Sequence, residues 1–235
     1  MILDRSEAYI GVMIDDLVTR GVVEPYRMFT SRAEHRLLLR EDNADERLVK
    51  RGASTGLVNA ETLRIVELRK KNLTDYLRQL NEVRIKPSAE LNEVVLSRGG
   101  SEIRETMSAA KFLKRPEIKF SDLAKLGIWG DVSLDEKLQS QIEIELKYEG
   151  YISRQKREAQ QLAKLEKVVI PETFDYGSVP GLSRELKERL SLVRPNSIGQ
   201  VSRVSGVTPA ALTAIMVILR ARGDKYEDNA MGKIL

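Results

Sequence analysis

Helical spacing of apolar residues dominates this chain and limits its fold more than any other feature. Leu, Ile and Val recur three or four residues apart through most of its length, whereas only residues 36–40 alternate with the period of two expected of a strand. Of the 235 residues, 42% are apolar, which is enough to bury a core. The sequence therefore predicts a mostly α-helical fold.

Capping residues divide this pattern into separate helices. Asn59 and Ser88 are placed to cap two of them, and Gly99 ends the second. Trp129, the only tryptophan, is expected to anchor the following bend in the core. The predicted helices of this half cover about residues 6–19, 60–81, 89–98 and 106–114.

The longest predicted helix follows a capping box formed by Ser133 and Glu136. Its apolar residues keep helical spacing to about Lys167, which predicts one rod roughly 50 Å long at 1.5 Å per residue. Gly150 is its one weak position.

Shorter helices are predicted after residue 170. Ser183 is placed to cap one, Ser197 and Gln200 form a second capping box, and Thr208 precedes a last helix. The polar tail after Gly223 is expected to fray. The expected whole is an elongated multi-helix bundle with a small C-terminal helical subdomain, divided at residues 1–50, 51–169 and 170–235.

Composition excludes several kinds of site. The chain has no cysteine and one histidine, His35, so thiolate chemistry is excluded and a zinc ligand set is almost unavailable. Neither a G-x-G-x-x-G turn nor a P-loop occurs, so no cofactor is expected to bind this chain alone. The longest apolar run, residues 210–219, is too short to span a bilayer, and with no secretory signal a cytoplasmic location is expected.

A dense alternation of Arg and acidic residues fills residues 24–48. Guanidinium groups bind phosphate and carboxylate equally well, so two interpretations stand side by side: an internal ion-pair network, or contact with RNA. The arginines in question are Arg27, Arg32, Arg36 and Arg40.

A second candidate surface lies on the long helix, where Tyr148 and Tyr151 flank Gly150 among basic residues. Such a surface can stack on bases or accept a partner helix, and a plain solvated face is the alternative. Residues 179–183 also resemble the turn of a helix-hairpin-helix module, which lets phosphate reach helix amides. The candidate binding residues are Lys147, Tyr148, Tyr151, Arg154, Lys156, Arg157, Arg184 and Arg203.

Several short motifs resemble those of one protein family. The run from Glu24 to Leu48 resembles a motif of the MnmG (GidA) family of FAD-dependent tRNA-modifying proteins. The net charge of the chain, +4, is compatible with an anionic partner such as tRNA. The similarity extends from about Ala8 to Arg220, with His35 where the family is expected to have Tyr. Other matching motifs are residues 9–11, 15–17, 115–117, 147–155, 170–171, 197–200 and 205–211.

The resemblance implies that this chain is the C-terminal portion of such a protein, with residues 1–50 as the tail of an upstream FAD-binding domain. The full-length parent would use FAD and NADH and act with the GTPase MnmE, as a homodimer in a heterotetramer. It would add a carboxymethylaminomethyl group to the wobble uridine of certain tRNAs. This chain would bind tRNA and MnmE and would be inactive alone, and no catalytic residue is carried over to it.

Two other functions are compatible with the sequence. One is a pure docking scaffold for the GTPase, with negligible affinity for RNA. The other is an autonomous nucleic-acid-binding module without preference for tRNA, which leaves the Glu24 to Leu48 run unexplained.

Overall fold

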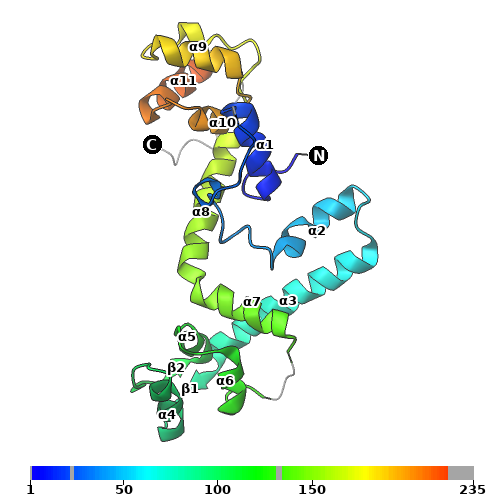
Figure 1. The fold of residues 1–235 in the computed structure, drawn as a ribbon, viewed down its shortest axis with the longest axis vertical. Coiled ribbons are helices and arrows are strands. Elements are labelled where there is room, and N and C mark those ends of the chain that lie inside the picture. Colours follow the sequence, from blue (N-terminus) through cyan, green and yellow to red (C-terminus); the bar gives the residue numbers. More distant parts are fainter. Residues whose placement is uncertain (1, 22–23, 131–133, 222–235) are drawn as a thin grey trace. The chain divides into compact units, whose positions relative to one another are not determined.

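The computed structural model describes residues 2–21, 24–130 and 134–221 (Figure 1). It contains two compact units, one made of residues 1–39 and 154–235 and the other of residues 40–153. They are called the terminal unit and the middle unit below. The described residues form eleven α-helices, two short 3₁₀ helices and two strands, so the prediction of a mostly α-helical fold is confirmed.

The terminal unit packs its last helices around their own core. Phe174 and Tyr176 meet edge to face at 4.9 Å between ring centroids. The amide of Ile198 donates to the carbonyl of Val168 at 2.9 Å, which ties the end of α8 to the start of α10. The elements are α1 (Tyr9–Thr19), η1 (Thr30–Arg32), the C-terminal part of α8 (Glu149–Glu166), η2 (Tyr176–Ser178), α9 (Arg184–Val193), α10 (Ile198–Arg203) and α11 (Pro209–Ala221).

The predicted caps of these helices are confirmed. The side chains of Ser183 and Ser197 accept hydrogen bonds from backbone amides three residues later, at 3.2 and 3.0 Å. Thr208 accepts one from Ala211 at 3.2 Å. Each cap satisfies an amide that the helix itself leaves without a partner. The tail after Gly223 lies outside the described residues.

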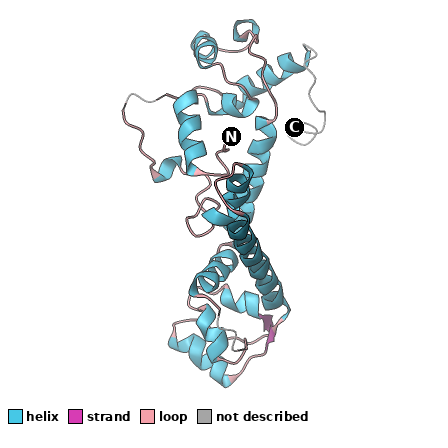
Figure 2. Cartoon of the chain, turned by 90° about the vertical axis from the view of Figure 1, so that its right-hand side faces the viewer, coloured by secondary structure: helices cyan, strands magenta, loops and turns pink. Residues whose placement is uncertain are grey.

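The core of the middle unit contains Trp129. Its ring packs edge to face on the rings of Tyr76 and Phe120, with 6.1 and 6.3 Å between ring centroids. Trp129 is buried, which confirms its predicted place in the core. Strands β1 (Arg84–Ile85) and β2 (Met107–Ser108) pair antiparallel, and Figure 2 shows them in magenta. The helices are α2 (Ala44–Ser54), α3 (Ala60–Glu82), α4 (Ala89–Ser97), α5 (Ala109–Leu113), α6 (Phe120–Lys125) and α7 (Glu136–Lys147).

The prediction of one long helix was wrong. Helix α7 ends at Lys147, Tyr148 leaves helical geometry with φ −104° and ψ 11°, and α8 begins at Glu149. The break comes before Gly150, whose surroundings are open. Packing explains its place, since Lys147 at the end of α7 donates to the carbonyl of Ile118 at 2.6 Å. Ser133 lies outside the described residues, and Asp135 caps α7 instead.

Two smaller predictions also need correction. Residues 36–40 form no strand, because the carbonyl of His35 accepts from the amides of Leu38 and Leu39 and closes a turn. The helix expected over residues 106–114 is α5, which begins only after Met107 and Ser108 have paired with β1. The three-part division at residues 50 and 169 stays a prediction. No helix in the described ranges is long and apolar enough to cross a membrane.

Candidate functional site

Four exposed cations share one side of the C-terminal half of α8. Lys156, Arg157 and Lys164 lie on the helix and Lys167 follows its end. At about 100° per residue the three helical residues fall within a sector of about 100°, and Lys167 comes directly after the helix. Between residues 153 and 167 that sector holds no acidic side chain. These four residues are called the basic face.

The acids of this segment are paired elsewhere. Glu158 accepts a hydrogen bond from Arg154 at 2.9 Å, and Glu166 forms an ion pair with Arg203 at 2.5 Å. In the described part of the chain, no ion pair joins the basic face to an acid. Its positive charge is therefore available to an anionic partner.

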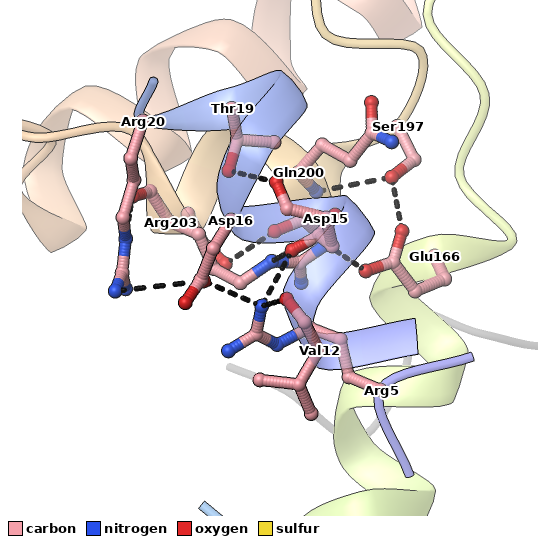
Figure 3. A network of polar contacts seen from close by, with 12 residues as sticks. Arg5, Val12, Asp15, Asp16, Thr19, Arg20, Glu166, Ser197, Gln200 and Arg203 are labelled. Atoms are coloured by element: carbon pink, nitrogen blue, oxygen red, sulfur yellow. Dashed lines mark hydrogen bonds and ion pairs between the residues drawn. The ribbon is translucent and has the colours of Figure 1, made fainter. Parts of the chain in front are cut away.

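A buried polar network joins α8, through Glu166, to α1 and α10 (Figure 3). Arg203 holds Asp15 with two hydrogen bonds, at 2.6 and 2.9 Å, and is only 8% exposed. Arg5 reaches Asp15 at 2.9 Å and Asp16 at 2.7 Å. Two-pronged pairs of this kind fix orientation as well as charge.

Hydrogen bonding controls the ionisation of Asp16 in this network. Burial alone would raise its pKa, but hydrogen bonds from Tyr26 and Arg5 outweigh burial and lower the pKa below its usual value. The Tyr26 hydroxyl donates to Asp16 at 2.8 Å. Asp16 is therefore held as a carboxylate inside the unit.

Two glycines allow the network to form. A side chain at Gly199 would place its Cβ 2.4 Å from the carboxyl carbon of Glu166. A Cβ at Gly11 would lie 2.5 Å from the carbonyl oxygens of Leu3 and Asp4. The motifs at residues 9–11, 15–17 and 197–200 thus converge on one structural feature.

His35 lies beside this network and is 2% exposed. Among the described residues, neither of its ring nitrogens has a hydrogen-bond partner. Burial lowers its pKa, an effect that Glu34 and Glu158 oppose only in part. The ring lines a cavity of about 270 Å³ together with Arg5, Ile14, Leu162 and Arg203.

The four arginines that the sequence singled out in residues 24–48 make different contacts in the structure. Arg40 binds Asp42 at 3.0 Å and Glu145 at 2.9 Å within the middle unit, which fits the ion-pair interpretation. Arg32 lies over the ring of Tyr26, 4.8 Å from its centroid. Arg27 and Arg36 are exposed.

The other predicted binding residues are also dispersed. Arg203 belongs to the buried network, and Lys147 is occupied by Glu143 and the backbone near Ile118. Tyr148 and Tyr151 are exposed by 45% and 67% in the middle unit. The remaining candidates, all exposed, are Arg154, Lys156, Arg157 and Arg184.

The sequence identified Lys156 and Arg157 of the basic face as candidate binding residues, but not the side of the helix that they share with Lys164 and Lys167. The spacing of one, eight and eleven residues from Lys156 carried that signal. No sequence pattern indicated that Arg5 and Asp16 are buried. Charged residues are usually exposed unless they are paired, and their partners cannot be recognised from the local sequence.

The described residues do not fit a dinucleotide cofactor. Each strand has two residues and neither leads into a glycine-rich turn at a helix N-terminus, the arrangement that binds a pyrophosphate. Within the same ranges, no three His, Cys, Asp or Glu residues are grouped to hold a metal ion.

Two family models match adjoining parts of the sequence. Residues 60–156 match the C-terminal helical domain of the tRNA modifying enzyme MnmG/GidA, and residues 158–233 match its C-terminal helical bundle. The chain belongs to the MnmG/GidA family.

Similar proteins agree with this assignment. Two curated relatives bear the name tRNA uridine 5-carboxymethylaminomethyl modification enzyme MnmG. The one from Syntrophobacter fumaroxidans is 46% identical over 221 residues, 94% of this chain and 34% of the relative. The one from Bacillus subtilis is 43% identical over 219 residues, 93% of this chain and 35% of the relative. This chain thus spans about a third of the length of these MnmG proteins.

Solved structures of Aquifex aeolicus GidA share the fold. In one crystal form the TM-score is 0.77 at 37% identity, and the match covers 93% of this chain and 34% of the GidA chain. In a second crystal form the TM-score is 0.73 at the same identity, over 93% and 33% of the two chains. The helical arrangement described above is therefore that of the C-terminal region of MnmG/GidA.

Proposed function

We propose that this chain is the tRNA-binding and partner-binding helical region of an MnmG enzyme, and that the basic face of α8 contacts tRNA phosphates. The observation that carries the proposal is the set of four exposed cations on one side of the helix, with the neighbouring acids paired elsewhere. The names of the relatives, which specify modification of tRNA uridine, point to the class of anion.

Counterion release gives this proposal a quantitative form. Each phosphate that a Lys or Arg neutralises releases condensed cations, so binding weakens as salt is added. Four such contacts give a slope of about −3 for the logarithm of the binding constant against the logarithm of salt concentration.

The test is fluorescence anisotropy of this chain with a labelled tRNA that carries a wobble uridine, at several salt concentrations. Changing Lys156, Arg157, Lys164 and Lys167 to Gln should weaken binding by at least about tenfold at low salt and remove most of the slope. A DNA hairpin of similar size serves as competitor, and poor displacement of the tRNA would show that the chain recognises more than phosphate charge.

A matched control removes the same number of charges elsewhere. Arg64, Lys70, Lys71 and Lys86 are exposed residues of the middle unit, and changing them to Gln lowers the net charge equally. If both variants weaken binding to the same extent, overall charge and not the basic face binds tRNA. If the unaltered chain does not bind tRNA at all, the proposal is wrong.

Docking of the GTPase MnmE is the second function proposed for this region. Tyr148 and Tyr151 support it, because exposed tyrosines are common at the centres of protein interfaces. The variant Tyr151→Ala should weaken MnmE binding in a pull-down or by calorimetry while tRNA binding is kept. If the Tyr151→Ala variant and the unaltered chain bind MnmE equally well, the surface around Tyr151 is not the docking site.

We propose that the intact MnmG enzyme to which this chain belongs acts on tRNA in the cytoplasm. It would use FAD and NADH bound outside this chain and would form a homodimer that assembles with MnmE into a heterotetramer. In that setting the basic-face variant should lower wobble-uridine modification through weaker tRNA binding. A raised KM for tRNA with little change in kcat would be its kinetic signature.

A further inference from the structure

The basic face of α8 has a restricted composition. The sector of the helix that holds Lys156, Arg157 and Lys164 also holds Gln160, which is exposed, and no apolar residue between positions 154 and 166. Residues 154–167 include no aromatic side chain at all. The surface therefore offers positive charge and one neutral amide to a partner.

Recognition of single-stranded RNA calls for a different surface. Proteins that bind unpaired bases stack them on aromatic rings or guanidinium planes, in a groove that follows the strand. The basic face has a single guanidinium, that of Arg157, and its three lysines act as point charges on phosphate. One side of a helix is also convex, so it does not enclose a flexible strand. This composition favours contact with the RNA backbone over contact with bases.

Contacts on the other sides of α8 hold the helix in place. The side-chain oxygen of Gln155 accepts a hydrogen bond from the amide of Leu37 at 3.1 Å. At the end of the helix, Glu166 forms an ion pair with Arg203 at 2.5 Å. Leu162, between these two contacts, is half-buried. The cations are thus carried by a fixed helix, which suits a regular anionic surface.

The cations form two pairs along this helix. Lys156 and Arg157 are adjacent, and Lys164 and Lys167 lie toward the other end, with Gln160 midway. The distance along the helix from Lys156 to Lys164 is about 12 Å at 1.5 Å per residue. Double-stranded RNA presents a phosphate strand on each side of a wide, shallow minor groove that displays ribose 2′-hydroxyls. A helix laid across that groove places one cation pair on each strand and Gln160 over the hydroxyls.

We infer that the basic face binds a base-paired stem of RNA across its minor groove, and not the single-stranded loop that holds the wobble uridine. The inference rests on the proposed function, because it takes RNA as the partner of this face. Lys156 and Arg157 contact phosphates of one strand, and Lys164 and Lys167 contact those of the other. Gln160 hydrogen-bonds a 2′-hydroxyl, a group that DNA lacks.

Competition against labelled tRNA, measured by fluorescence anisotropy with the whole chain, tests which kind of RNA binds. One competitor is an RNA hairpin of about sixteen base pairs, the length that double-stranded RNA-binding domains span. The other is single-stranded oligouridine with the same number of nucleotides. The hairpin should displace tRNA at a concentration at least about tenfold lower than oligouridine does. A smaller difference, or stronger competition by oligouridine, would overturn the inference.

Gln160→Leu separates recognition of the sugar from attraction to phosphate. The variant should lose at least about threefold of the preference for the RNA hairpin over a DNA hairpin of matching sequence. The dependence of binding on salt should stay the same, because no cation is removed. Gln79→Leu is the matched control, since Gln79 on α3 is also exposed, and it should change neither quantity. An unchanged preference in Gln160→Leu, or an equal loss in the control, would contradict the role of Gln160.

The variant with all four cations changed to Gln distinguishes failure of this inference from failure of the proposed function. Binding of the hairpin should weaken by at least about tenfold, and binding of oligouridine should change little. If both weaken equally, the basic face binds RNA without selecting stems, and only the inference is wrong. If neither weakens, the basic face does not bind RNA, and the proposed function is wrong as well.

Discussion

At the scale of single residues, the close contact between Glu166 and Gly199 helps to hold the terminal unit together. Glu166 lies against the backbone of Gly199 and there receives a hydrogen bond from Ser197 and an ion pair from Arg203. A larger residue at position 199 would push the carboxylate away from both. The local sequence revealed the cap at Ser197, since capping depends on neighbours, but Glu166 is 31 residues away and was not predictable.

Gly199→Ala should therefore lower the free energy of unfolding by about 1–3 kcal/mol, the usual cost of overpacking. Gly150→Ala is the control, because nothing lies within 4 Å of the added Cβ on α8. That variant should raise stability by about 0.5–1 kcal/mol. Urea unfolding measures both, and a loss below a few tenths at position 199 would show that Glu166 relaxes freely.

At the scale of elements, a buried network of charged side chains links helices α1, α8 and α10. Arg203 is 8% exposed and Asp15 is 12% exposed, so their pair is largely removed from water. Breaking such a pair leaves an uncompensated charge behind, which costs more than a surface pair contributes. This makes Arg203 a structural residue of the unit.

Arg203→Met should destabilise the chain by about 3–5 kcal/mol, because Asp15 loses its principal partner. Arg184→Met removes an ion pair whose arginine is 93% exposed, and it should change stability by less than about 1 kcal/mol. Thermal unfolding of the two variants compares them directly. Similar melting temperatures would mean that water enters the network.

Elements also show where sequence reasoning succeeds and fails. Asn59, Ser183 and Ser197 were correctly predicted as caps because a cap needs only its own helix. The break at Tyr148 was missed because it depends on where α7 is tied by contacts near Ile118. The helix over residues 6–19 was predicted from the sequence, but the exposure of its residues Ile10, Ile14 and Val18 was not. Their outward direction follows from the ion pairs of Arg5 and Arg203, which no local pattern connects to this helix.

At the scale of the whole molecule, His35 gives stability a distinct dependence on pH. It is the only histidine, so it is the one side chain with an ordinary pKa between about 6 and 7. Its pKa is lowered in the folded chain by burial. Between the two values the unfolded chain binds more protons, and stability therefore rises with pH in that window.

Acidification from about pH 7.5 to 5.5 should lower the free energy of unfolding by up to about 1.4 kcal/mol, as the unfolded imidazole takes up a proton. His35→Phe should remove most of that change, although Glu34, Glu158 and Arg5 also influence the site. Urea titrations at the two pH values measure the difference. An identical pH dependence in the variant would show that the folded imidazole protonates freely.

The contact between Glu166 and Gly199 also has a consequence for how the sequence can vary. The space that the carboxylate occupies is the space that a Cβ at position 199 would need. The two positions are therefore expected to change together in a lineage, with a shorter residue at 166 preceding any side chain at 199. In an alignment of many relatives, this pair should covary although 33 positions separate it along the chain.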